Sequence, residues 1–374
     1  MWNYLYTFIA LTTLAVIPNA IAQFSYVKSI VFIILGLLFV TLPFIKNKGF
    51  IRFSNKWIAG FFIYFILSFG YFYLSPSIGK GQADWSIIPS LMGIISFLII
   101  KTLVESTDKL DRWIDISKFL CWFGFGIAVY AILQFFGLDQ MFPKTELYFS
   151  GPCFTTFGNS MLTANFLACI SPLCLIFKER RSKLIYAVLF VAVCLCKSEL
   201  SLGVFALGLL LFLFLTNRRK LCLALAVSLV LLLIVLYKVN PLSFSLNARD
   251  DMWWRAIEEW RKAPWTGHGF GSFYYRDYVM WYANIQRSSH CILLDFLHNS
   301  GIIGVTLILG YLISLVKRIF RADRDILLIG LSVSFFVYCL IGLVSYFTAP
   351  MILVGLIYIS GLEVLLLKED LRYE

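Results

Sequence analysis

Long apolar stretches separated by short polar connections make up most of this chain. A helix needs about 20 apolar residues to cross a bilayer, and the sequence supplies about twelve such stretches. The predicted spans are residues 4–22, 27–45, 56–75, 84–104, 115–136, 160–178, 183–197, 200–216, 220–238, 291–316, 325–345 and 348–368. The first has no basic start and runs straight into the second, so we expect a membrane span there and not a cleaved signal peptide. The pattern predicts an all-α fold, a polytopic transmembrane helical bundle forming a single membrane domain over residues 1–374.

One long polar stretch, residues 239–290, interrupts this pattern between the ninth and tenth spans. Within it, residues 247–262 carry apolar side chains at helical spacing. These are Trp253, Ala256, Ile257 and Trp260. Asn247 is a suitable N-cap, Asp250 follows three residues later, and Pro264 ends the helix. We therefore expect a long outer loop containing an amphipathic helix that lies on the membrane surface or on the bundle.

Arg249 is the unusual residue of this predicted helix. At about 100° per residue it falls in the middle of the apolar stripe, whereas Arg255 and Lys262 face away. It also lies in the first turn, where a positive charge opposes the helix dipole. A cation placed against both preferences indicates a compensating anion, and the free amides at the helix start would help it grip a phosphate. The alternative is an arginine that reaches lipid headgroups or pairs with Asp250 or Asp251.

A glycine-rich segment follows the helix. Gly267, Gly269 and Gly271 allow the backbone to approach a ligand or a neighbouring helix closely. A dinucleotide-binding fold would need a preceding strand and a following amphipathic helix, and the sequence predicts neither. His268, between the glycines, is interpreted as a turn residue in preference to a catalyst. The aromatic side chains that come next predict an interfacial belt, with a sugar-stacking platform as the alternative. They are Tyr274, Tyr275, Tyr278, Trp281 and Tyr282.

His290 ends the polar stretch and begins the next span. An ionisable group at that depth is costly and usually faces a cavity. Because imidazole titrates near neutral pH, a histidine here is a natural group to take a proton from a hydroxyl. A lone histidine is more often a hydrogen-bonded structural residue, so its position alone leaves both roles open.

Composition and charge agree with the membrane assignment. Hydrophobic residues make up 60% of the chain and charged residues 14%, against about 25% charged in soluble domains. Most basic residues fall in connections on one predicted side, whereas the short connections of the other side hold only Lys28, Lys80, Lys144 and Lys197. By the positive-inside rule, both termini are cytoplasmic and loop 239–290 is periplasmic. The net charge of +11 is then mainly a topological signal, and we expect no nucleic-acid binding.

The nine cysteines predict neither a disulfide framework nor a zinc site. All lie inside apolar segments except Cys153 and Cys291, which lie at their edges, so we interpret them as small hydrophobic residues. Cys194 and Cys196 have no second pair at a metal-binding spacing.

Two blocks of sequence carry a resemblance. Residues 249–273 contain an arginine, tryptophans, a proline and a G-x-G-x-G run, and His290, Leu294 and Gly301-Ile302-Ile303-Gly304 follow. Thr155-Thr156-Phe157-Gly158-Asn159 precedes another predicted helix. These blocks resemble the large outer loop and the T-F-G-N segment of the bacterial O-antigen ligase and O-antigen polymerase superfamily. The resemblance covers roughly residues 150–310.

The chain departs from that family at two places. Family members usually have asparagine directly after the histidine, where this chain has Cys291, so the network that would orient His290 is weakened. They also tend to carry an arginine just before T-F-G-N, where this chain has Gly151-Pro152-Cys153. One phosphate-binding cation is therefore missing, and Lys144, Arg276 and Arg287 are the candidates to replace it.

The resemblance implies a membrane glycosyltransferase in the bacterial cytoplasmic (inner) membrane. Because acidic residues are few on the outer side and lack metal-ligand spacing, we expect a metal-independent reaction that uses no cofactor. It would transfer a glycan from an undecaprenyl-diphosphate carrier, a polyprenyl-diphosphate-linked glycan donor, to a hydroxyl of a glycan or lipid A-core acceptor. His290 would be the catalytic base. Arg249, Arg276 and Arg287 would bind the diphosphate, with further loop contacts from Gly267, His268, Gly269 and Gly271.

Other functions stay open. The same features fit an O-antigen or exopolysaccharide polymerase of the superfamily. A lipid-linked sugar transporter or flippase would predict internal repeats and charges at mid-membrane, but we see no convincing repeat and the charges cluster at the outer edge. A structural partner of another enzyme would not need Arg249 in an apolar stripe. At 374 residues, without an added C-terminal domain, the chain favours plain ligases or polymerases over protein-glycosylating relatives.

Overall fold

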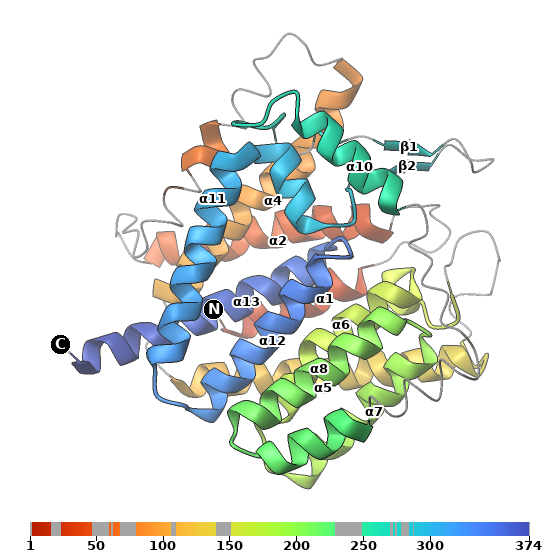
Figure 1. Cartoon of the computed structure of the whole chain (residues 1–374), viewed down its shortest axis with the longest axis vertical. Coiled ribbons are helices and arrows are strands. Elements are labelled where there is room, and N and C mark those ends of the chain that lie inside the picture. The colour runs from red at the N-terminus through yellow and green to blue at the C-terminus, as the bar shows by residue number, and fades with distance from the viewer. Residues whose placement is uncertain are drawn as a thin grey trace.

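A computed structural model describes residues 2–15, 24–46, 60, 63–67, 80–105, 110–139, 151–228, 249–269, 272–273, 275–277, 284–286 and 288–373. In this part of the chain the protein is a bundle of helices (Figure 1). They are α1 (Trp2–Leu14), α2 (Phe24–Lys46), α4 (Lys80–Glu105), α5 (Leu110–Phe135), α6 (Ser160–Cys174), α7 (Arg180–Leu195), α8 (Glu199–Leu215), α10 (Arg249–Trp260), α11 (Ile292–Arg321), α12 (Ile326–Gly342) and α13 (Ala349–Tyr373), with a short 3₁₀ helix η1 (Thr155–Phe157). Residues 219–228 are also helical. Within the described ranges, only β1 (Tyr275–Asp277) and β2 (Asn284–Gln286) are strands, and they pair antiparallel.

The apolar pattern predicted the helices well. Three are long and apolar enough to cross a membrane, and each overlaps a predicted span: Leu110–Phe135, Ile292–Arg321 and Ala349–Lys368. Shorter apolar helices at Val27–Thr41, Leu91–Val104, Ser160–Cys174, Glu199–Leu215 and Ile326–Gly342 overlap five more. Most of predicted spans 56–75 and 220–238 lies outside the described residues. The helical membrane protein is confirmed, while the number of about twelve spans remains a prediction.

Helix α6 lies at the centre of the packing. It contacts α5, α7, α8 and α12, and these helices lie side by side in Figure 1. All of its side chains except Met161 are buried, including the polar Thr163 and Asn165. Among the described elements, helix α11 packs chiefly on α10. The first turn of α6 and the start of α11 carry the residues considered below.

Lys28 corrects a sequence prediction. The sequence placed it in a short outer connection, but it lies inside α2 and is only 1% exposed. Its Nζ donates hydrogen bonds to the carbonyls of Thr13 and Ala15, where the dipole at the end of α1 favours a cation. The same Nζ lies 5.8 Å from the centre of the Phe157 ring. A single lysine is thus buried because carbonyl groups satisfy its donors.

A buried ion pair joins α11 to α13. Glu363 is 3% exposed, and its carboxylate accepts hydrogen bonds from Arg318 at 2.8 Å and from the Tyr311 hydroxyl at 2.9 Å. Charges inside a membrane protein are normally paired in this way. The pair attaches the second half of α11 to the bundle.

Helix α11 is broken at Gly301, which has φ 60° and ψ −167°. Inside a membrane, the backbone groups freed by such a break need partners within the protein. The loop after α10 supplies them through four main-chain hydrogen bonds: His268 N–H to His298 O, Gly269 N–H to Asn299 O, Ile302 N–H to Pro264 O (2.9 Å each) and Ile303 N–H to Trp265 O (3.2 Å). The Tyr64 hydroxyl also contacts the Ser300 carbonyl at 2.8 Å. The loop therefore holds the first part of α11 in place.

Gly267 is the residue that permits this close packing. It has φ 68°, and a Cβ there would lie 2.5 Å from the carbonyl carbon of Asn299 and 2.6 Å from the nitrogen of Ser300. Of the two uses that the sequence left open for the glycines, close approach to a neighbouring helix is the one seen for Gly267 and Gly269. Gly271 lies outside the described residues.

Gly267→Ala is therefore expected to destabilise the protein by about 1–3 kcal/mol, because the new methyl group meets backbone and the residue has a positive φ. Thermal unfolding of the purified protein in detergent measures the change. Gly126→Ala is the matched control: Gly126 is exposed in α5 with no atom within 4 Å of its Cβ position, and alanine should stabilise that helix by about 0.5–1 kcal/mol. Equal unfolding temperatures for the two variants would show that the packing at Gly267 is loose.

Candidate active site

Arg249 opens α10 and lies half-buried against the start of α6. Its Nη2 donates to Sδ of Met161 at 3.2 Å. Met161 is the one side chain of α6 that is not buried. Burial lowers the pKa of Arg249 from its ordinary value, yet an arginine stays charged at neutral pH. The described residues form no ion pair between Arg249 and Asp250 or Asp251, so that alternative is not the arrangement seen.

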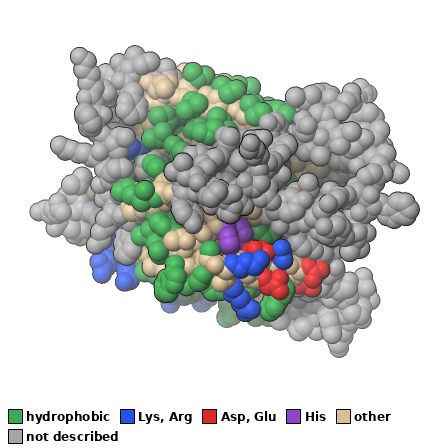
Figure 2. All heavy atoms as spheres, turned by 90° about the horizontal axis from the view of Figure 1, so that it is seen from above, with side chains coloured by type: hydrophobic (Ala, Val, Ile, Leu, Met, Phe, Trp, Pro, Cys, Tyr) green, Lys and Arg blue, Asp and Glu red, His purple; other side chains and the backbone are tan. Residues whose placement is uncertain are grey.

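Of the predicted apolar stripe of α10, Ala256 is buried, and Trp253, Ile257 and Trp260 are partly buried. Met252 and Ala256 are buried on the side that packs against α11. On the other side, Glu259 pairs with Arg255 at 2.7 Å and with Lys262 at 2.8 Å. Figure 2, which looks down on this end of the molecule, shows the basic and acidic side chains next to each other. The exposed Arg255 and Lys262 are thus neutralised by a neighbouring carboxylate, whereas Arg249 is not.

The T-F-G-N segment forms the start of α6. Asn159 is the N-cap, and its Oδ1 accepts a hydrogen bond from the N–H of Met161 at 2.7 Å. Thr155 has φ 44°, which is unfavourable for a residue with a side chain. Its N–H donates to Oε1 of Gln134 at 2.6 Å, and its hydroxyl lies 2.9 Å from the hydroxyl of Thr163. This segment fixes Met161 and thereby brings the two sequence blocks together at Arg249.

His290 lies in the turn just before α11, with a positive φ of 60°. Its ring packs edge-on against Tyr346, with 4.8 Å between ring centres and 80° between ring planes. Burial, and after it the positive charge of Arg249, lowers the pKa of His290 from 6.5 to about 4. The imidazole is therefore neutral at pH 7, and Arg249 and His290 are close enough to interact electrostatically.

A buried polar network lies next to Tyr346 along the chain. The amide of Asn165 in α6 donates to the Ser345 hydroxyl at 3.1 Å, and the Ser201 hydroxyl of α8 donates to the Asn165 amide oxygen at 2.7 Å. Hydrogen bonds between helices are expected where polar groups are buried in a membrane protein. The network ties the connection between α12 and α13, which carries Tyr346, to the centre of the bundle.

The remaining predicted site residues divide into two groups. Nε2 of His268 lies 2.7 Å from the carbonyl oxygen of Glu259, which is the arrangement expected of a turn residue. The others lie outside the described residues, either wholly or by their side chains: Lys144, Gly271, Tyr274, Tyr275, Arg276, Tyr278, Trp281, Tyr282 and Arg287. The described part of the site thus comprises Arg249 and His290, flanked by Met161 and Tyr346, which the sequence had not suggested.

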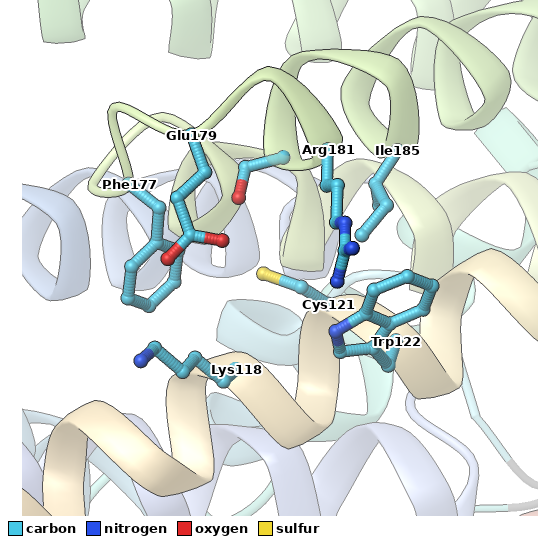
Figure 3. A pocket seen from close by; sticks show the side chains of 8 residues that line it. Lys118, Cys121, Trp122, Phe177, Glu179, Arg181 and Ile185 are labelled. Atoms are coloured by element: carbon cyan, nitrogen blue, oxygen red, sulfur yellow. The ribbon is translucent and has the colours of Figure 1, made fainter.

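A small cavity of about 80 Å³ lies elsewhere, between α5 and the start of α7 (Figure 3). It is lined by Lys118, Cys121, Trp122, Phe177, Glu179, Arg181, Ser182 and Ile185. Met161 lies in the first turn of α6 and Phe177 follows its end, so this cavity and Arg249 lie at opposite ends of that helix. The cavity is not part of the candidate site.

Comparison with known proteins identifies one family. Residues 184–309 match the family model Wzy_C, described as O-antigen ligase. The matched region runs from α7 into α11 and contains Arg249, the glycine-rich loop and His290. No curated protein matches the chain. The resemblance seen in the sequence to the O-antigen ligase and polymerase superfamily is confirmed over this region.

Proposed function

Because residues 184–309 carry the domain of the O-antigen ligase and polymerase superfamily, we propose that this protein transfers a glycan from a polyprenyl-diphosphate carrier to an acceptor hydroxyl. The reaction takes place at the outer face of the cytoplasmic membrane, where loop 239–290 lies. The donor is a glycan on undecaprenyl diphosphate, and the acceptor belongs to a lipid A-core or to another glycan.

The observation that carries the proposal is that one cation, Arg249, acts on one neutral imidazole, that of His290. Arg249 is half-buried without a carboxylate partner in the described structure, and its charge acts on His290. The two residues come from opposite ends of a long polar loop, and packing of α10 on α11 brings them together. A cation can bind the negatively charged diphosphate, and a neutral imidazole can accept the proton that the acceptor hydroxyl must lose.

The proposed chemistry is a single displacement. The acceptor oxygen forms a bond to the anomeric carbon of the glycan while the bond from that carbon to the diphosphate oxygen breaks. The leaving diphosphate takes the electron pair, and Arg249 stabilises its negative charge. His290 accepts the proton of the acceptor hydroxyl. Arg249 offsets part of the negative charge of the leaving group, and Arg276 and Arg287 of the same loop are the candidates for the further positive charge that a diphosphate needs.

The low pKa of His290 gives a testable pH dependence. The free protein needs a neutral imidazole, so kcat/KM should stay level from pH 8 to about 5 and fall as pH drops through about 4. In the complex, the negative diphosphate should raise the pKa of His290, so kcat should fall at a higher pH than kcat/KM. Initial rates at buffered pH test this, with activity recovered on return to pH 7 as the control. A fall in kcat/KM centred at 6.5, the ordinary histidine value, would contradict the assignment.

The products that accumulate in cells lacking the protein separate the remaining alternatives. Carrier-linked polymer at the outer face would identify a ligase, and single carrier-linked repeat units would identify a polymerase of the same superfamily. If the protein were a transporter or flippase, cells lacking it would have no carrier-linked intermediate at the outer face. That result would exclude glycan transfer. Extraction of membrane lipids followed by mass spectrometry provides the measurement.

A further inference from the structure

One carboxylate organises the turn that carries His290. Oδ1 of Asp295, in the first turn of α11, accepts hydrogen bonds from the N–H and the hydroxyl of Ser289, both at 2.7 Å. Its Oδ2 accepts a hydrogen bond from the Ser288 hydroxyl at 2.6 Å. The Ser288 oxygen in turn accepts the main-chain N–H of His290 at 3.0 Å. Asp295 is thus connected to the backbone of His290 through one hydroxyl.

This network stabilises His290 in an unfavourable backbone conformation. With φ 60° it lies in the left-handed region, which residues with side chains adopt only when their surroundings fix it. The following residue, Cys291, is the N-cap of α11 but makes no side-chain capping bond. The side-chain hydrogen bonds seen in this turn come instead from Ser288, Ser289 and Asp295.

Both carboxylate oxygens of Asp295 accept hydrogen bonds within this network. Three donors of its own turn occupy them at short distances, so the carboxylate is engaged by the protein and does not face a substrate. A negative charge in the first turn of α11 also interacts favourably with the helix dipole. Asp295 therefore acts on the neighbouring turn and not on the reacting atoms.

We propose that Asp295 is the positioning residue for His290: it holds the turn of Ser288 to Cys291 so that the imidazole lies beside Tyr346 and Arg249. This inference rests on the proposed role of His290 as the base. Removal of Asp295 releases the turn, and His290 leaves the left-handed conformation that directs its ring.

The test compares Asp295→Ala with Asp295→Asn in the purified full-length protein. Asp295→Ala should lower kcat about 100-fold, since a misplacement of about 1 Å has effects of this size, while KM stays unchanged. Asp295→Asn keeps the shape and one acceptor, so it should recover at least about a tenth of the wild-type kcat. Asp251→Ala, which removes an exposed acidic residue from the first turn of α10, is the control and should leave kcat unchanged.

A double variant separates a positioning role from a general structural one. If Asp295 acts through His290, Asp295→Ala should cause no further loss in a protein that already carries His290→Ala. An equal loss in both backgrounds would overturn the proposal, as would an Asp295→Ala variant with the activity of Asp251→Ala. Full activity of His290→Ala alone would instead refute the role of His290 as the base, on which this inference rests, and no glycan transfer by the wild-type protein would refute the proposed function. If Asp295→Ala does not fold, Ser288→Ala, which cuts the connection to the His290 N–H, should lower kcat by itself, and unchanged kcat would overturn the proposal.

Discussion

Replacement of His290 by alanine is expected to abolish glycan transfer while the protein still inserts into the membrane. The variant loses the only group in the described site that is neutral at pH 7 and able to take a proton, since the pKa of His290 is about 4. Loss of a general base lowers rates by about 10²–10⁴-fold. The measurement is the surface polysaccharide of cells that carry the variant as their only copy, together with the amount of protein in the membrane.

His268→Ala is the matched control for this experiment. His268 belongs to the same loop, but its Nε2 lies against the carbonyl of Glu259, so its removal should cost one hydrogen bond and leave transfer intact. Normal surface polysaccharide in cells with His290→Ala, at normal protein levels, would remove His290 from the mechanism.

The second large effect is expected at Arg249. Arg249→Ala should lower the rate of transfer by about 10²–10³-fold, because Arg249 is the one described cation whose charge acts on His290 and could stabilise the leaving diphosphate there. Arg249→Lys keeps the charge but not the two-pronged geometry, so it should retain an intermediate rate. Initial rates of the purified variants with a carrier-linked glycan provide the comparison.

Arg255→Ala is the control on the same helix. Arg255 is exposed and paired with Glu259 at 2.7 Å, and an exposed ion pair contributes about 0–1 kcal/mol to stability. Its removal should leave the rate within about twofold of wild type. If Arg255→Ala and Arg249→Ala reduce the rate equally, α10 acts through its overall charge and not through one buried guanidinium.

The local features of the site were predictable from sequence because they depend on short-range pattern. Helical spacing places Arg249 on the apolar face of α10, and the structure has it half-buried there. The change from polar to apolar sequence at His290 likewise marks the start of α11. The T-F-G-N segment before a helix is seen as η1 and the N-cap of α6.

The contacts across the bundle were not predictable, because they depend on which helices pack together. Met161 has no unusual pattern in the sequence and becomes notable only because α10 places Arg249 against it. Tyr346 lies in a connection far along the chain from His290, and the two meet through packing near α12 and α13. Lys28 was misplaced because a single charge resembles a loop residue, whereas the carbonyls of α1 allow it to be buried.

The central claim is that Arg249 and His290 together release a glycan from its diphosphate carrier. The most direct measurement uses the purified protein in liposomes, a labelled glycan on undecaprenyl diphosphate, and either lipid A-core or a second carrier-linked glycan as acceptor. We expect the wild-type protein to release undecaprenyl diphosphate as label appears in one acceptor, and the His290→Ala and Arg249→Ala variants to release almost none. Release at the wild-type rate by both variants, or no release by the wild-type protein with either acceptor, would contradict the account.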